Sequence, residues 1–165
     1  MRFCLATTPS VGEAIRELST VLTRSGIEDR FVTFVVAVLN LDDFSMTFVN
    51  AGHLPPLRRR TGTTTVQEVA DDIVGLPLGV LDRPYREQTV TLEPGDTLVL
   101  YTDGVTEARS PDGGFYGVDR LREVVRTADD DVEILGPAIL DDVRLFAAGR
   151  PQSDDLTIVC FSRAK

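Results

Sequence analysis

Residues 97–107 read Thr-Leu-Val-Leu-Tyr-Thr-Asp-Gly-Val-Thr-Glu, an apolar run that ends in a carboxylate. The run Thr97–Tyr101 is rich in branched and aromatic side chains, which predicts a buried β-strand. Asp103 stands where this strand ends, and Gly104 allows the backbone to turn sharply behind it. A carboxylate fixed at the end of a rigid strand is a suitable ligand for a hard divalent cation.

A second acidic cluster, Ser153-Asp154-Asp155-Leu156-Thr157, opens the last predicted strand, Leu156–Phe161. If the two strands are neighbours, Asp103 and Asp154 meet although roughly 50 residues separate them in the chain. Taken alone, each cluster is also typical of an ordinary turn or a solvated loop, because Asp-Gly and Ser-Asp pairs are common there. A shared metal site is therefore a hypothesis that needs both clusters.

Hydrophobic periodicity places the other elements of the chain. Helices are predicted over Pro9–Arg24, with a Ser10–Glu13 capping box and a stop at Gly26, and over Tyr116–Arg126 and Val132–Ala148. Further strands are predicted over Phe31–Leu39 (buried on both faces), Met46–Asn50, Leu57–Arg60 (its arginines at an exposed edge), Thr63–Val69 and Gln88–Leu92, and residues 75–81 form a loop packed against the body. One helix, several hairpin strands, further helices and a last strand make a segregated α+β pattern with mostly antiparallel sheets.

Composition narrows the class of protein. A chain of 165 residues favours a single domain, and 17 basic against 26 acidic side chains give a net charge of −9. This charge disfavours binding to nucleic acid and to anionic membranes, and no apolar run approaches the roughly 20 residues of a membrane span. Cys4 and Cys160 lie in apolar runs and are predicted to be reduced core residues of a cytoplasmic protein.

Other kinds of active site find little support. His53 is the single histidine, and in a turn between strands a structural role is the stronger interpretation. One histidine and two cysteines far apart in the chain do not give the ligand spacing of a zinc site, and the apolar surroundings of both cysteines would raise the pKa of their thiols. The chain also lacks a phosphate-binding glycine loop with its lysine and a strand-to-helix elbow for a serine nucleophile.

Read in order, the motifs resemble one known family. They are Phe31-Val32-Thr33, Asn50-Ala51-Gly52-His53, Pro55-Pro56, Gly75-Leu76-Pro77-Leu78-Gly79, Pro94-Gly95-Asp96, Tyr101-Thr102-Asp103-Gly104-Val105-Thr106-Glu107, Phe115-Tyr116-Gly117 and Asp154-Asp155-Leu156-Thr157. This series resembles the metal-dependent Ser/Thr protein phosphatases of the PPM (type 2C) family, in the bacterial SpoIIE-like branch. The resemblance runs from one end of the chain to the other.

The resemblance implies a fold and a mechanism. It implies two packed antiparallel sheets flanked by helices, an αββα sandwich, with two Mn²⁺ or Mg²⁺ ions that activate a water for attack on a phosphoserine or phosphothreonine. Asp103 and Asp154 match metal ligands of the family and are the implied catalytic residues. Asp155, at the neighbouring position, is a further candidate metal ligand. His53 matches a hallmark of the branch without a catalytic role carried over.

The resemblance also implies a protein partner, and this sequence departs from the family's pattern at its N-terminal end. Relatives in this branch act on phosphorylated antagonists of anti-sigma factors, which is the substrate class expected here. The family's Gly-Asp-x-x-Asp motif and its first strands have no match, and the sequence opens at what resembles the tail of the first helix, Arg2–Thr8. We therefore expect the C-terminal two-thirds of one phosphatase domain over residues 1–165, with an incomplete metal site and strand edges that favour a homo-oligomer. The alternative is a catalytically weak or inactive pseudophosphatase that acts as a protein-binding module.

Overall fold

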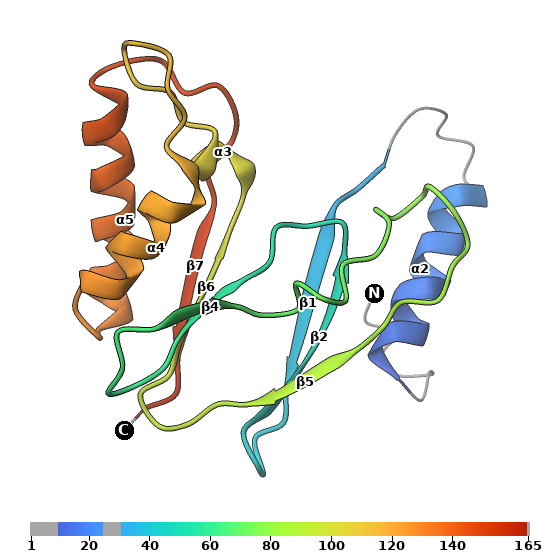
Figure 1. Ribbon diagram of the computed structural model, residues 1–165. Helices are drawn as coiled ribbons and strands as arrows, with labels where there is room; N and C mark the ends of the chain where they lie inside the picture. Colours follow the sequence, from blue (N-terminus) through green and yellow to red (C-terminus); the bar gives the residue numbers. More distant parts are fainter. Residues whose placement is uncertain (1–9, 25–30, 165) are drawn as a thin grey trace. The chain divides into compact units, whose positions relative to one another are not determined.

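The computed structural model describes residues 10–24 and 31–164 and divides the chain into two compact units (Figure 1). Unit 1 comprises residues 1–55 and 70–92, and unit 2 comprises residues 56–69 and 93–165. Cys4, Gly26 and the segment Arg2–Thr8 lie outside the described residues. None of the described helices is long and apolar enough to cross a membrane.

Unit 1 is a three-stranded antiparallel sheet covered by one helix. Its elements are α2 (Val11–Arg24), β1 (Phe34–Leu39), β2 (Ser45–Ala51) and β5 (Gln88–Thr91), and the strand order is β1-β2-β5. The Ser10 half of the predicted capping box is confirmed, because the Glu13 N–H donates to Ser10 Oγ at 3.2 Å. The Glu13 carboxylate instead accepts from Arg16 Nη1 at 2.8 Å. The apolar stripe of α2 packs Ile15 against Val36 and Val49 of the sheet.

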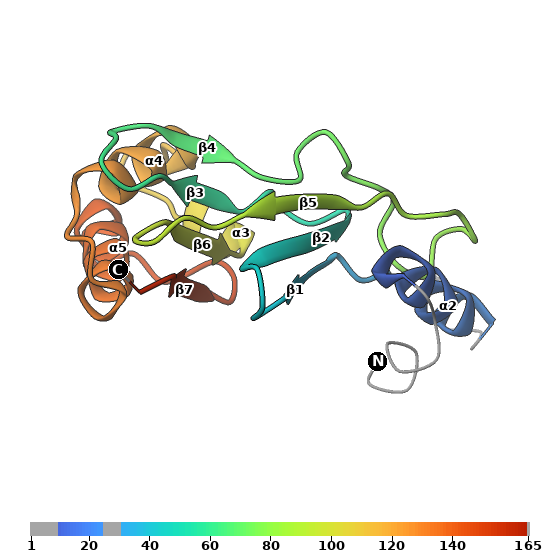
Figure 2. The same ribbon diagram turned by 90° about the horizontal axis from the view of Figure 1, so that it is seen from below.

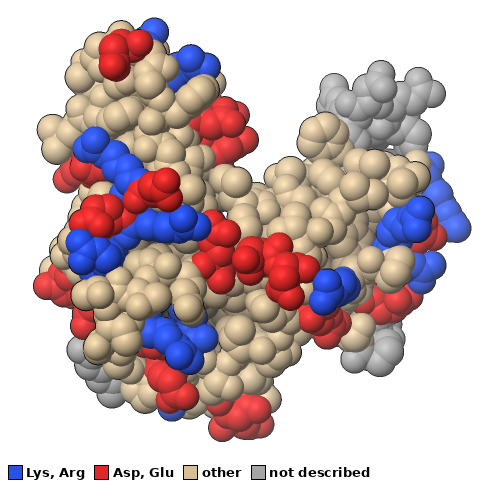
Figure 3. Space-filling view, viewed as in Figure 1, with Lys and Arg blue, Asp and Glu red and all other residues tan. Residues whose placement is uncertain are grey.

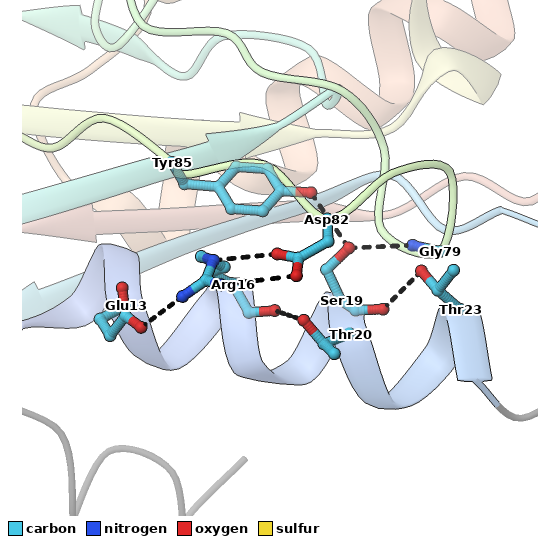
Figure 4. A network of polar contacts seen from close by, with 8 residues as sticks. All are labelled: Glu13, Arg16, Ser19, Thr20, Thr23, Gly79, Asp82 and Tyr85. Carbon is cyan, nitrogen blue, oxygen red and sulfur yellow. Dashed lines mark hydrogen bonds and ion pairs between the residues drawn. The ribbon is translucent and has the colours of Figure 1, made fainter.

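The loop of residues 75–81 packs against unit 1, as predicted. Leu78 joins the core that α2 closes, and its backbone forms a bridge with Val32. Polar contacts reinforce this attachment (Figure 4): buried Ser19 Oγ accepts from the Gly79 N–H at 3.2 Å, and Arg16 Nε donates to Asp82 Oδ1 at 2.9 Å. The loop is therefore fixed to the helix by both apolar packing and hydrogen bonds.

Unit 2 is a four-stranded antiparallel sheet with helices. Its strands are β3 (Leu57–Arg59), β4 (Val66–Glu68), β6 (Thr97–Tyr101) and β7 (Ile158–Ser162), in the order β4-β3-β6-β7. Its helices are α3 (Asp103–Thr106), α4 (Gly117–Thr127) and α5 (Val132–Ala147). Apolar side chains of α4 and α5, including Leu121 and Ile139, are fully buried. Figure 2 shows α4 and α5 together beside the strands of this sheet.

The prediction that the arginines of β3 lie at an exposed edge is wrong. Arg58 is 7% exposed and Arg59 is 4% exposed, because β3 lies inside the sheet between β4 and β6. Burial is possible because every charge has partners. Arg58 forms an ion pair with buried Asp96, and Arg59 donates to carbonyl oxygens at the end of α4, at 2.6 Å for Val125 and 2.8 Å for Ala128.

The prediction that β1 is buried on both faces is also wrong. Val36 is buried, but Val38 is exposed and the other residues of the strand are half-buried. Among the described strands β1 lies at the edge of its sheet, with β2 as its paired neighbour. An apolar run alone does not distinguish an edge strand from a central one, which explains the error.

Candidate metal centre

The two acidic clusters lie side by side at one end of the unit 2 sheet. β6 and β7 are antiparallel neighbours with Tyr101 paired to Ile158, so the chain leaving β6 meets the chain entering β7 (Figure 1). The pairing continues beyond the strands, since the Thr102 N–H donates to the Thr157 carbonyl at 3.1 Å. The segments that carry Asp103 and Asp154 are therefore joined by backbone hydrogen bonding.

Thr102 fixes the two segments to each other through its side chain. Its hydroxyl donates to the Asp155 carbonyl at 2.9 Å and accepts from the Thr157 N–H at 2.9 Å. The motif series contains Thr102 and Thr157 but predicts no role for either threonine. The signal was present, because a threonine beside each acidic cluster offers a hydroxyl that can bridge neighbouring strand ends.

Gly104 makes the close approach possible. A Cβ at this position would lie 2.9 Å from the Asp155 carbonyl carbon and 3.1 Å from the Asp154 carbonyl oxygen, and closer still to the Asp155 carbonyl oxygen. These contacts are with backbone atoms, which cannot rotate away. Glycine is needed at position 104 because a side chain there would collide with the backbone of Asp154 and Asp155. An unusual backbone dihedral angle is not the reason.

The three carboxylates project from this end of the sheet and are exposed. Asp103 Oδ1 accepts from the Gly104 N–H at 3.0 Å, and Asp154 Oδ1 accepts from the Asp155 N–H at 2.7 Å. These local bonds orient each carboxylate and leave lone pairs directed to solvent. Carboxylates held in this way are suitable ligands for Mg²⁺ or Mn²⁺.

Two ionisable side chains of β6 and β7 are unsuited to nucleophilic or base catalysis. Burial raises the pKa of Tyr101 to about 12, so its phenol stays protonated at neutral pH. Burial also raises the pKa of the Cys160 thiol, as the sequence predicted, and a protonated thiol is a poor nucleophile.

His53 belongs to unit 1 and has local partners. Its backbone N–H donates to Asn50 Oδ1 at 2.8 Å, and its ring Nδ1 lies 3.4 Å from Thr33 Oγ1. These contacts tie the turn after β2 to the chain before β1. They fit the structural role that the sequence favoured.

Comparison with known proteins identifies the family. The model of the family "Stage II sporulation protein E (SpoIIE)" matches residues 1–164. The chain belongs to the SpoIIE family. The resemblance to the SpoIIE-like branch seen in the motif series is thereby confirmed.

The relatives of this chain include proteins that are much longer than the chain itself. Protein IcfG of Synechocystis sp. is 26% identical over 144 residues, which cover 87% of this chain and 22% of IcfG. Phosphoserine phosphatase RsbU of Bacillus subtilis is 29% identical over 118 residues, which cover 68% of this chain and 35% of RsbU. The chain thus spans about a fifth to a third of the length of these curated relatives.

Solved structures confirm the fold of the SpoIIE-family chain. The SiaA-PP2C domain of Pseudomonas aeruginosa matches with a TM-score of 0.76 at 21% identity, over 92% of this chain and 59% of that one. The phosphatase domain of SpoIIE from Bacillus subtilis matches with a TM-score of 0.70 at 16% identity, over 99% of this chain and 71% of that one. The predicted α+β class with two antiparallel sheets flanked by helices is therefore correct. The face-to-face packing of the two sheets and the single-domain assignment stay predictions.

Proposed function

We propose that this chain is the catalytic part of a metal-dependent phosphoserine/phosphothreonine protein phosphatase. The observation that carries the proposal is the junction of the strand ends of β6 and β7, which sets Asp103 and Asp154 on hydrogen-bonded neighbouring segments. Membership of the SpoIIE family supports it, as does the likeness to a relative described as a phosphoserine phosphatase.

The donor set fits a divalent cation in part. Asp103 and Asp154 would hold the ion, with Asp155 beside them, and all three offer the hard oxygen donors that Mn²⁺ and Mg²⁺ prefer. Over residues 10–24 and 31–164, no group of three or more His, Cys, Asp or Glu side chains gathers closely enough to hold a metal. The carboxylates would therefore supply part of a coordination shell, and the incomplete metal site expected from the sequence stays a prediction.

The chain's own residues would bind and orient the cation and the substrate rather than attack the phosphoryl group. When bound, divalent cations supply an acidified water as the nucleophile and positive charge opposite the phosphoryl oxygens. Thr102 and Gly104 hold the two acidic segments at a fixed separation, which pre-organises the ligands. Because the nucleophile would be this water, the chemistry needs no phosphorylated enzyme intermediate.

The substrate class and the cellular compartment are inferred from membership of the family. We infer that the substrate is a phosphorylated protein, an antagonist of an anti-sigma factor, in a partner-switching pathway of the kind that involves RsbU. We also propose a cytoplasmic location, as the expectation of reduced cysteines suggests. Strand edges at β1 and β7 support self-association of the chain.

Hydrolysis of an aryl phosphate with Mn²⁺ tests the proposal. We expect a metal-dependent rate in the wild type that Asp103→Asn lowers at least about a hundredfold, because one ligand of the catalytic cation is lost. Asp119→Asn, whose carboxylate is 93% exposed on α4, is the control and should keep the wild-type rate. Equal rates in the wild type and Asp103→Asn would contradict the metal mechanism. A wild type without metal-dependent activity would favour the binding module.

A further inference from the structure

A pocket of about 220 Å³ adjoins the candidate metal centre within unit 2. Gly104 and Ser153, the neighbours of Asp103 and Asp154, form part of its wall. Leu140 and Val143 of α5 and Leu156 give it apolar surface. The pocket therefore lies between the C-terminal half of α5, the start of α3 and the chain that leads into β7.

The charge of this pocket is opposite to that of the chain. The net charge of the protein is −9, yet the ionisable residues that line the pocket are Arg109, Arg144 and Arg150, with no Asp or Glu among its described lining residues. A concave wall with one sign of charge attracts ligands of the other sign. The pocket thus favours an anionic group, beside carboxylates that favour a cation.

The three arginines are held in different ways. Arg150 Nη1 donates to the Ser110 carbonyl at 2.8 Å, and the Arg109 guanidinium lies 4.4 Å from the centre of the Phe115 ring, which is itself exposed. Arg144 is 69% exposed, and its nearest acidic partner, Asp141, lies 3.7 Å away. Arg144 is therefore the arginine most available to an incoming anion. An exposed aromatic ring beside arginines is also a combination enriched at protein interfaces.

The size of the pocket limits its occupant. Sites for small molecules and cofactors usually enclose about 300–1,000 Å³, so this pocket is small for one. It suits one acidic side chain with its apolar stem. Guanidinium groups bind carboxylates through paired hydrogen bonds, and the apolar wall would contact the methylene groups.

We propose that this pocket, defined by Arg109, Arg144 and Arg150, binds an Asp or Glu side chain of the phosphoprotein substrate that stands close to the phosphorylated residue. The inference rests on the proposed function, because it places the phosphoryl group at the neighbouring acidic pair. It makes Arg144 a specificity-determining residue for acidic segments.

The test compares two labelled peptides by fluorescence anisotropy in the presence of Mn²⁺. Both carry a non-hydrolysable phosphonate in place of phosphoserine, flanked by Asp in one peptide and by Asn in the other. We expect the wild type to bind the Asp peptide about tenfold more tightly. Arg144→Glu should abolish this preference without changing the thermal unfolding midpoint, since its ion pair is exposed.

Arg126→Glu is the matched control. Arg126 also sits on an exposed helix face of unit 2 and pairs with an acidic residue three positions earlier, Glu123, but it does not line the pocket. Basic and acidic side chains are interspersed on the side of the molecule that Figure 3 shows. A general effect of charge reversal on peptide binding would therefore appear in the control as well. The proposal is overturned if the wild type binds both peptides equally, if Arg144→Glu keeps the preference, or if Arg126→Glu loses it equally.

Failure of this inference can be separated from failure of the proposed function. A Mn²⁺ titration of the same proteins reports on the acidic pair alone. Saturable Mn²⁺ binding with no peptide preference would leave the phosphatase proposal in place and remove the pocket. An Arg144-dependent preference without Mn²⁺ binding would keep the pocket as a peptide site and remove the metal mechanism.

Discussion

Two aspartates flank strand β6, and their surroundings differ. Asp96 precedes the strand, is 2% exposed, and accepts hydrogen bonds from Arg58 Nε at 3.0 Å, the Thr61 N–H at 3.0 Å and the Glu93 N–H at 3.1 Å. Asp103 follows the strand, faces solvent, and accepts from the Gly104 N–H at 3.0 Å. One carboxylate is saturated by the protein, and the other keeps lone pairs open.

The difference separates a structural carboxylate from an available one. A buried carboxylate is tolerated when its lone pairs are filled, and it then stabilises the hairpin turns around it. A carboxylate with open lone pairs at a rigid strand end can accept a cation. The same residue type therefore has opposite roles at the two ends of one strand, and the following predictions test this contrast.

The largest expected effect is on folding. Asp96→Asn should lower the free energy of unfolding by about 3–5 kcal/mol, because it removes the negative charge that forms the ion pair with buried Arg58. Urea unfolding measures it, with Asp119→Asn as the exposed control at about 0–1 kcal/mol. A loss below about 1 kcal/mol for Asp96→Asn would show that the buried pair does not secure this end of the sheet.

A smaller effect is expected at the junction of the acidic segments. Gly104→Ala places a Cβ against the backbone of Asp154 and Asp155 and should cost about 1–3 kcal/mol. It should also weaken Mn²⁺ binding, since the segments must separate. Gly136→Ala is the control: its Cβ would meet Cys160 Sγ at 3.7 Å, an ordinary contact, and alanine favours the helix by up to about 1 kcal/mol. Destabilisation of equal size in both variants would contradict this reading.

Acid should weaken the fold through the buried carboxylate. Burial raises the pKa of Asp96, but hydrogen bonds from Arg58, Thr61 and Glu93 outweigh it and leave this pKa below its ordinary value. Such a group stabilises the fold above the unfolded-state pKa of about 3.9, and the stabilisation is lost as pH falls through the folded-state pKa. Asp142, whose pKa Arg120 lowers, acts in the same direction. The free energy of unfolding should therefore decrease from about pH 5 downward, and a value that stays constant or rises would contradict the account.

The smallest effect on stability is expected for the open carboxylate. Asp103→Asn should change the free energy of unfolding by less than about 0.5 kcal/mol, because the residue is exposed and its local hydrogen bond survives in the amide. Chemical unfolding without metal measures this change. A loss as large as that of Asp96→Asn would mean that both ends of β6 serve the fold alone.

Much of the fold could be predicted from the sequence because its patterns are local. The period of α2, the turn before Thr97 and the strand Thr97–Tyr101 follow from side-chain spacing and turn residues, and the structure confirms them. Neighbouring positions of a strand or helix carry this information directly. Such features do not depend on which element lies beside them.

The errors arise where partners distant in the chain decide the outcome. Arg58 and Arg59 suggest an exposed edge until Asp96 and the carbonyls at the end of α4 are known to lie beside them. In the candidate site, the meeting of the segments of Asp103 and Asp154 could be inferred from the motif series. The bridging hydroxyl of Thr102 and the arginine-lined pocket needed the register of β6 against β7 and the packing of α5.

The central claim is that Asp103 and Asp154 hold a divalent cation together. Calorimetric titration of the wild type, Asp103→Asn and Asp119→Asn with Mn²⁺ tests it most directly. The account predicts saturable binding in the wild type and in Asp119→Asn, weakened at least about tenfold in Asp103→Asn. Identical isotherms for the wild type and Asp103→Asn, or no binding heat in the wild type, would contradict it.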